Sequence, residues 1–252
     1  IRNRQGAALN FDYKPNDDVR LYARTLFSHF TDMEQRQEFC VNLEDAFADD
    51  LPPGTYKAGK AVNRNAKYRF EDEHIATVNL GGEFTLGAGK LEVDVTSSTA
   101  IKDDDPRYNF AYAGKKGTTG TYDFSGELPV VTPDALAYDA TTYEAKSAEL
   151  EADHARETLN QASADYTLPT SAFGGDTIFK MGVKYSERHK RSAVTYRYYD
   201  VGDMTLSDFS AYDAGSLYGT KFGPTVDGLK SLDHAEANGL MELDVGESIA
   251  DE

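Results

Sequence analysis

Three short turn segments divide the chain at wide, similar intervals, and this spacing constrains the fold more than any other feature. They are 14–18, 87–90 and 168–176, and each is flanked by alternating apolar and polar residues. Long acidic stretches separate one turn from the next. Period-two alternation puts apolar side chains on one face of a strand and polar ones on the other. The sequence therefore predicts long antiparallel hairpins with short turns at one end and long connections at the other.

The alternation predicts which residues share a face. In the clearest hairpin, Val78 and Leu80 alternate with Asn79 and Gly81 before the turn. The same rule gives the apolar face of each of about six long strands, which the following ranges contain: 7–13, 19–27, 74–86, 91–99, 162–168 and 179–185. Aromatic residues recur near the turns, as in the interfacial girdle of a membrane barrel: Phe11, Tyr13, Tyr22, Phe84, Tyr166, Phe179 and Tyr185.

The connections on the other side are predicted to be long loops, at about 34–65, 102–142 and 200–252. The usual connection in a compact domain has about 2 to 6 residues, so loops this long favour the outside of a barrel. The runs 68–86 and 177–198 exceed the roughly 9 to 11 residues that cross a bilayer and are expected to project beyond it. The segment 144–159 has strong helix formers, and we interpret it as a strand extension, with a short loop helix as the alternative.

Composition excludes several classes of function. The formal net charge is −17, which would repel a nucleic-acid backbone, so no nucleic-acid partner is expected. Uninterrupted apolar runs fall far short of the roughly 20 residues of a membrane helix. A mean hydropathy of −0.57 is compatible with a soluble protein or with a barrel, in which only every second strand residue meets lipid. The single cysteine, Cys40, permits no internal disulfide.

Two segments resemble a known family. The run from Phe11 to Arg24 (FDYKPNDDVRLYAR) and the run from Phe27 to Arg36 (FSHFTDMEQR) resemble the barrel wall of TonB-dependent outer-membrane receptors. A strand there ends in an aromatic-x-Pro-x-Asp turn and is followed by an L-Y-x-R strand. The run from Phe179 to Arg188 is similar to another wall strand of the family. Within the family, these segments resemble the subgroup of receptors associated with carbohydrate uptake.

The resemblance implies a fold and a function for residues 1–252. The fold class would be all-β, an antiparallel transmembrane β-barrel wall segment with short periplasmic turns and long extracellular loops. Such receptors have 22 strands, so the chain would be a partial barrel domain without the plug. It would lie in the outer membrane of a Gram-negative cell and import an oligosaccharide or siderophore by energy-coupled transport, powered by the inner-membrane TonB complex through the plug. The alternative is a soluble secreted all-β carbohydrate-binding module.

Candidate chemistry in the sequence is sparse. The acidic run 103–105 is interpreted as a solvated loop, because it lacks the Gly and Glu positions of an EF-hand. The histidines are widely scattered, form no close pair, and are interpreted as wall or loop positions: His29, His74, His154, His189 and His234. No Ser, Cys or Thr lies in a known nucleophile motif such as Gly-x-Ser-x-Gly, or at a recognisable spacing from a catalytic base. We therefore expect no enzyme activity, no cofactor and no metal site.

Aromatic loop segments are the candidate ligand contacts. Aromatic faces beside Asp, Asn and Arg suit a sugar, because the rings cover C–H patches and the polar groups bind hydroxyls. Two segments have this composition, 108–112 and 196–200. The predicted ligand-binding residues are Tyr108, Phe110, Tyr112, Tyr196 and Tyr198.

Overall fold

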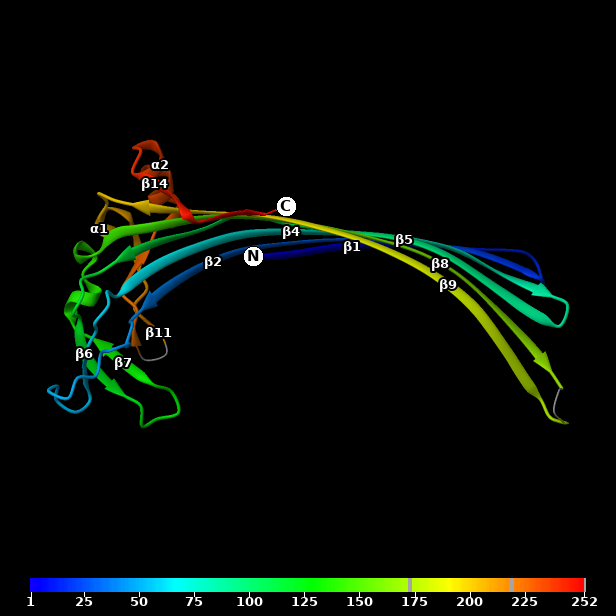
Figure 1. The fold of residues 1–252 in the computed structure, drawn as a ribbon, viewed down its shortest axis with the longest axis horizontal. Helices are drawn as coiled ribbons and strands as arrows, with labels where there is room; N and C mark the ends of the chain where they lie inside the picture. The colour runs from blue at the N-terminus through cyan, green and yellow to red at the C-terminus, as the bar shows by residue number, and fades with distance from the viewer. Residues whose placement is uncertain (172–173, 218–219, 252) are drawn as a thin grey trace.

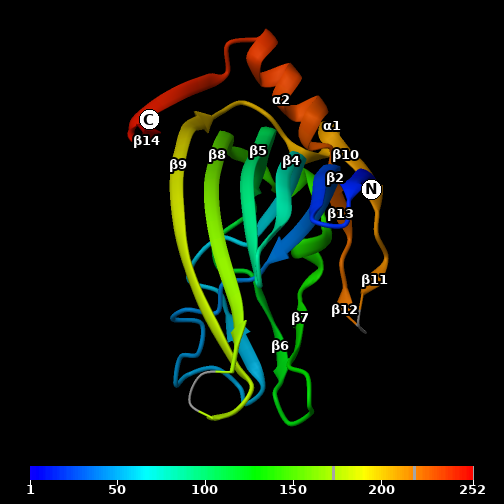
Figure 2. The same ribbon diagram turned by 90° about the vertical axis from the view of Figure 1, so that its right-hand side faces the viewer.

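A single curved antiparallel sheet dominates the computed structural model, which describes residues 1–171, 174–217 and 220–251. Figure 1 shows its long strands arching from the hairpin turns at one end to a group of small elements at the other, and Figure 2 shows the strands side by side. In spatial order they are β1 (Arg2–Asn16), β2 (Val19–Cys40), β4 (Asn63–Leu86), β5 (Gly89–Ala113), β8 (Glu144–Thr170), β9 (Thr177–Val201) and β14 (Met241–Asp251).

The predicted hairpins are present, and the all-β antiparallel class is confirmed. The predicted count of about six strands is wrong, because β14 adds a seventh strand to the sheet beside β9. Its sequence lies inside the last predicted loop and lacks the length of the other strands. The described strands form an open sheet, with β1 and β14 at its two edges. The segment 144–159 is strand, as the favoured interpretation predicts.

Two of the predicted loops begin too early. Strand β2 continues to Cys40 and β5 to Ala113, while β9 ends at Val201. These outer strand parts carry charged and aromatic residues on both faces, which hides the alternation that marks the other end. The acidic run 103–105 consequently lies within β5, and its interpretation as a solvated loop is wrong. Asp104 is only 3% exposed.

The register joins the predicted apolar faces into one surface. Directly paired residues share a face of a sheet, and the pairs link Phe11 to Ala23, Ala23 to Leu80, Leu80 to Val95, and Val95 to Ala162. We call this side the belt face and the opposite side the polar face. Large side chains on the belt face near the turns are exposed, among them Leu9 (72%), Leu80 (54%), Val95 (59%) and Val183 (71%).

The connections fold into small elements at the end remote from the hairpin turns (Figure 1). One three-stranded sheet contains β3 (Thr55–Lys57), β6 (Thr119–Asp123) and β7 (Val130–Pro133). Two-stranded sheets pair β10 (Ser210–Asp213) with β13 (Pro224–Val226), and β11 (Ser216–Leu217) with β12 (Thr220–Lys221). The helical elements are η1 (Ala135–Tyr138), η2 (Ala140–Thr142), α1 (Leu206–Phe209) and α2 (Gly228–Ala237). Among the described residues, no helix is long and apolar enough to span a membrane.

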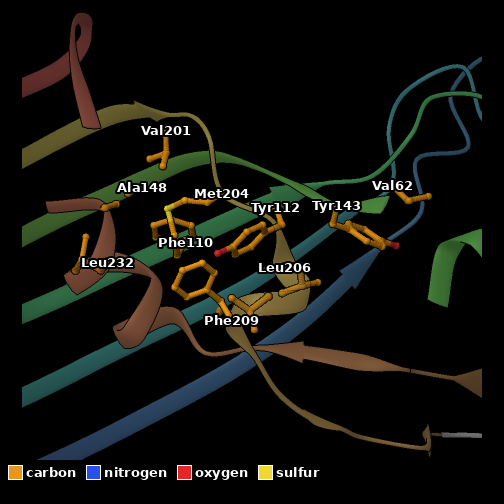
Figure 3. Packing of buried hydrophobic residues seen from close by; sticks show 13 residues of the cluster. Val62, Phe110, Tyr112, Tyr143, Ala148, Val201, Met204, Leu206, Phe209 and Leu232 are labelled. Atoms are coloured by element: carbon orange, nitrogen blue, oxygen red, sulfur yellow. The ribbon is translucent and has the colours of Figure 1, made fainter. Parts of the chain in front are cut away.

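The main core lies between these elements and the belt face of the outer strand ends. Figure 3 shows Phe110, Tyr112, Phe209 and Leu232 gathered in one cluster. Helix α2 sits close to the sheet because its first residue is glycine: a Cβ on Gly228 would lie 2.9 Å from the Cβ of Ala66. The Asp227 side chain caps the helix by accepting from the backbone N–H of Lys230. The same sheet face is thus covered at one end and bare at the other.

A buried arginine ties the small elements to the sheet. Arg64 on β4 is 1% exposed and donates to the carbonyl oxygens of Pro224 (2.7 Å), Phe222 (2.7 Å) and Ala137 (3.0 Å). Its guanidinium also lies 4.1 Å from the ring centroid of Phe39. One side chain therefore links β4 to segments more than 70 residues away in sequence.

Candidate ligand site on the polar face

A charged and aromatic patch covers the polar face of the outer strand ends, opposite the core. It combines Arg36 on β2 with Lys67 and Arg69 on β4, and extends over β5, β8 and β9. Within it lies a polar cavity of about 190 Å³. The cavity is lined by Arg36, Lys67, Arg107, Tyr108, Asn109, Glu149 and Glu151. We call this group the polar-face site.

Ion pairs between neighbouring strands hold the site together. Arg107 on β5 contacts Glu151 on β8 at 2.8 Å. On β4, Arg69 lies 3.2 Å from Glu34 and 3.3 Å from Glu71. The paired residues lie on neighbouring strands or two positions apart on one strand, so the backbone of the sheet holds the charged groups in place. The arrangement presents guanidinium donors and carboxylate acceptors to the same space.

Burial shifts the acidity of two groups beside the cavity. Desolvation raises the pKa of Asp104, and the nearby cations Arg69, Arg107 and Lys102 partly oppose that rise. Desolvation also lowers the pKa of Lys67, and the positive charge of Arg107 acts in the same direction. Both groups are therefore partly shielded from water, and hydrogen bonds are stronger in such surroundings than in bulk water.

Two of the predicted ligand-binding residues lie on this face. Tyr196 pairs with Glu151 and Tyr198 pairs with Glu149 across the β8–β9 ladder, which places both rings beside the cavity. Burial raises the pKa of Tyr196, and the negative charge of Glu149 adds to the rise. The site therefore combines aromatic rings with acids, an amide and guanidinium groups.

The other three predicted residues are distributed differently. Tyr108 is half-buried and borders the cavity, but its ring lies on the belt face, where it packs against the core and stacks on Tyr68 with ring centroids 5.3 Å apart. Phe110 and Tyr112 are 0% exposed and belong to the core under α2 (Figure 3). Burial raises the pKa of Tyr112 to about 12. The prediction that 108–112 forms a loop is wrong, because these residues lie in β5, where Tyr108, Phe110 and Tyr112 share the face that α2 covers.

The residues that sequence reasoning missed are the charged ones. Lys67, Arg107 and Glu151 appear in the sequence as isolated charges on long strands, and only the register of β4, β5 and β8 brings them together. Their alternation with Ala66, Tyr108 and Leu150 was the available signal. That signal is weak because aromatic and charged residues occupy both faces in this region.

A second convergent group lies on the belt face. His29 on β2 and His74 on β4 are directly paired and stacked, with ring centroids 4.2 Å apart. The Nε2 atoms of both rings lie 2.9 Å from the same oxygen, Oδ1 of Asp72. The sequence predicts these histidines to be scattered, because 44 residues lie between the two along the chain. Strand pairing makes them neighbours.

No protein-family model matches the chain, and no curated protein matches it significantly.

Proposed function

We propose that the chain is a section of the wall of an outer-membrane TonB-dependent receptor, which imports a scarce ligand of the carbohydrate or siderophore class by energy-coupled transport. The observation that carries this proposal is the exposed apolar surface near the hairpin turns, continuous in register over β1 to β9. A surface of this kind is what a lipid-facing wall needs, because lipid-facing and lumen-facing residues alternate along each strand.

The two faces near the turns differ in the way the proposal requires. On the polar face, Arg20 contacts Asp12 at 2.7 Å and Glu83 at 3.0 Å, and the Tyr22 hydroxyl donates to Asp94 at 2.8 Å. These hydrogen-bonded charges would line an aqueous lumen. The edges at β1 and β14 would join the remaining strands of the receptor, since an unpaired edge is a liability in an isolated sheet.

The polar-face site is the proposed place of ligand contact. It lies on the lumen side beyond the apolar surface, which corresponds to the extracellular mouth. Tyr196 and Tyr198 would stack on ring faces of an oligosaccharide, while Glu149, Glu151 and Arg107 would bind its hydroxyl groups. The plug and the inner-membrane TonB complex would supply the energy coupling, and the wall itself performs no covalent chemistry.

The soluble carbohydrate-binding module makes an opposite demand. It needs a second layer of protein over the apolar surface, because soluble monomers rarely expose apolar patches larger than a few hundred Å². Within 1–171, 174–217 and 220–251, the exposed side chains of Leu80, Val95 and Val183 have no such cover. The membrane proposal accounts for these side chains, and the soluble module does not.

Spin labelling along β8 tests the proposal with a control built into the strand. In a Cys40→Ser background, single cysteines at consecutive positions 159–166 would be labelled and the chain reconstituted in lipid vesicles. We expect the even positions, which include Ala162 and Ala164, to be accessible to oxygen from the lipid. The odd positions, which include Gln161 and Ser163, should be accessible to a water-soluble nickel complex. Equal accessibility of both sets to the nickel complex would refute a lipid-facing wall.

A further inference from the structure

The histidine and aspartate side chains on the belt face form a group that the proposed function does not use. His29, His74 and Asp72 have ligand atoms that all lie within 4.8 Å of one another. His29 and His74 lie on the belt face one row beyond Phe27 and Ala76, on the side away from the hairpin turns, and Asp72 lies in the row after them. All three side chains are half-buried.

The geometry of this group is close to that of a metal site. Zinc binds histidine nitrogen at about 2.0 to 2.1 Å and carboxylate oxygen at about 2.0 to 2.2 Å. Tetrahedral ligands at such distances are separated by about 3.3 Å. The two Nε2 atoms are each 2.9 Å from Asp72 Oδ1, so an opening of a few tenths of an ångström would admit the ion. The two rings are stacked at an interplanar angle of 11°, so they would tilt toward each other to direct both nitrogen lone pairs at one ion.

A second observation on the neighbouring strand points to a cation. Asp103 on β5 pairs directly with Asp72, so two carboxylates face each other across the β4–β5 ladder. Like charges directly opposite in a sheet are destabilising. Each of the two is contacted by histidine, and for Asp103 this is Nδ1 of His154 on β8. Three histidines and two aspartates thus share one face over four adjacent strands.

We propose that His29, His74 and Asp72 bind a divalent transition-metal ion of the zinc class. Two imidazole nitrogens favour Zn²⁺, Cu²⁺ or Ni²⁺ over Ca²⁺ and Mg²⁺, which prefer ligand sets made only of oxygen. Three protein ligands leave a coordination position for water or for an external anion. The ion would join β2 to β4 and offset the repulsion between the two carboxylates.

This site is independent of ligand import, because it lies on the face opposite Tyr196 and Tyr198. Its residues come from a ladder that runs without register shifts from Val19–Phe84 to Cys40–Asn63. The backbone therefore holds the ligands in place, and metal binding and receptor function can be tested separately.

Calorimetric titration of the chelator-treated full chain in detergent is the decisive experiment, in a Cys40→Ser background that removes a competing thiolate. We expect one Zn²⁺ to bind per chain with a dissociation constant below about 10 µM, which corresponds to a binding free energy of about 7 kcal/mol or more. The double variant His29→Gln/His74→Gln should lose about 100-fold or more, since even losing an outer partner of a ligand lowers affinity about 10- to 100-fold. Ca²⁺ should not compete.

Two matched variants separate metal binding from folding. Asp72→Asn retains the size of the side chain and should also weaken Zn²⁺ binding. His189→Gln changes a histidine on β9 that contacts Glu187 at 2.9 Å and lies outside the proposed site, so it should leave binding unchanged. Electron paramagnetic resonance of bound Cu²⁺ should show two coordinated imidazole nitrogens. Equal Zn²⁺ affinity of the wild type and the double variant would overturn the proposal. So would a wild-type dissociation constant weaker than about 1 mM, which corresponds to a binding free energy of only about 4 kcal/mol.

Discussion

The buried guanidinium of Arg64 offers the sharpest test of how the small elements are attached to the sheet. Its hydrogen bonds to Pro224, Phe222 and Ala137 are charge-assisted, and each such bond contributes about 1.5 to 3 kcal/mol. Arg64→Met removes all of them and leaves carbonyl oxygens without their donor. The variant also avoids burying a cation, which recovers several kcal/mol. The expected net loss of local stability is about 3 kcal/mol.

Native-state hydrogen exchange measures this loss where it occurs. A change of 1.4 kcal/mol is tenfold in an equilibrium constant, so about 3 kcal/mol corresponds to a fall of about 100-fold in protection. We expect that fall at the amides of Ala137 and Val226, whose hydrogen bonds to Asp134 and Gln37 depend on the attached segments. Amides of the β1–β2 hairpin should be unaffected, because local openings are cooperative only within a unit.

Two further variants sharpen the Arg64 test. Arg64→Lys keeps the charge but cannot reach three carbonyls with a planar fork, so its protection should lie between wild type and Arg64→Met. Arg36→Met removes a guanidinium whose side chain is 49% exposed and pairs with Glu38, and it should change protection little. Unchanged protection at Ala137 and Val226 in Arg64→Met would refute the view that this side chain fastens the small elements.

Three other perturbations have defined outcomes. Ala162→Arg places a charge on the belt face and should lower the free energy of unfolding from lipid vesicles by about 2 to 4 kcal/mol near mid-membrane. Gln161→Arg places the same charge on the polar face and should change that free energy by less than about 1 kcal/mol. Equal effects of the two variants would contradict the assignment of the faces. Because the pKa of Asp104 is raised in the folded state, the folded chain binds more protons than the unfolded chain, and this group's contribution to stability falls as pH rises from the unfolded pKa through the folded one. Denaturant titrations over this pH range should show a smaller fall in the free energy of unfolding for Asp104→Asn than for the wild type. Gly120→Ala should destabilise the β3–β6–β7 sheet by about 1 to 3 kcal/mol, seen as faster proteolysis there, because its Cβ would collide with the carbonyl oxygen of Thr132.

Near the hairpin turns, the sequence alone was enough to predict the structure. Alternation assigns Leu80 and Val95 to one face and Asn79 and Asp94 to the other, and the pairing of β4 with β5 agrees with this. Prediction succeeds there because one face is uniformly apolar, and a one-residue slip would move every side chain to the wrong side. The turn chemistry of Gly87, which has a φ of +63°, fixes the same register locally.

The outer strand ends follow a different logic, and the sequence predicted them poorly. Tyr108 and Phe110 were expected in a loop because charged and aromatic residues occupy both faces, which removes the period-two signal. The core under α2 explains the aromatic residues on the belt face, but the partners of Phe110, such as Phe209 and Leu232, come from a distant part of the chain. The pattern of neighbouring residues around Phe110 does not reveal that segments about 100 residues later in the chain cover it.

The sequence by itself determined the hairpins, the direction of the strands and the two chemically distinct faces, because each depends on the alternation of neighbouring residues. Only the tertiary structure decided which charges meet in the polar-face site and that His29 and His74 share a carboxylate. These contacts depend on the register between strands that are far apart in sequence. Side chains such as Arg107 and Glu151 have no local signature of their partners, and pairing alone brings them within 2.8 Å.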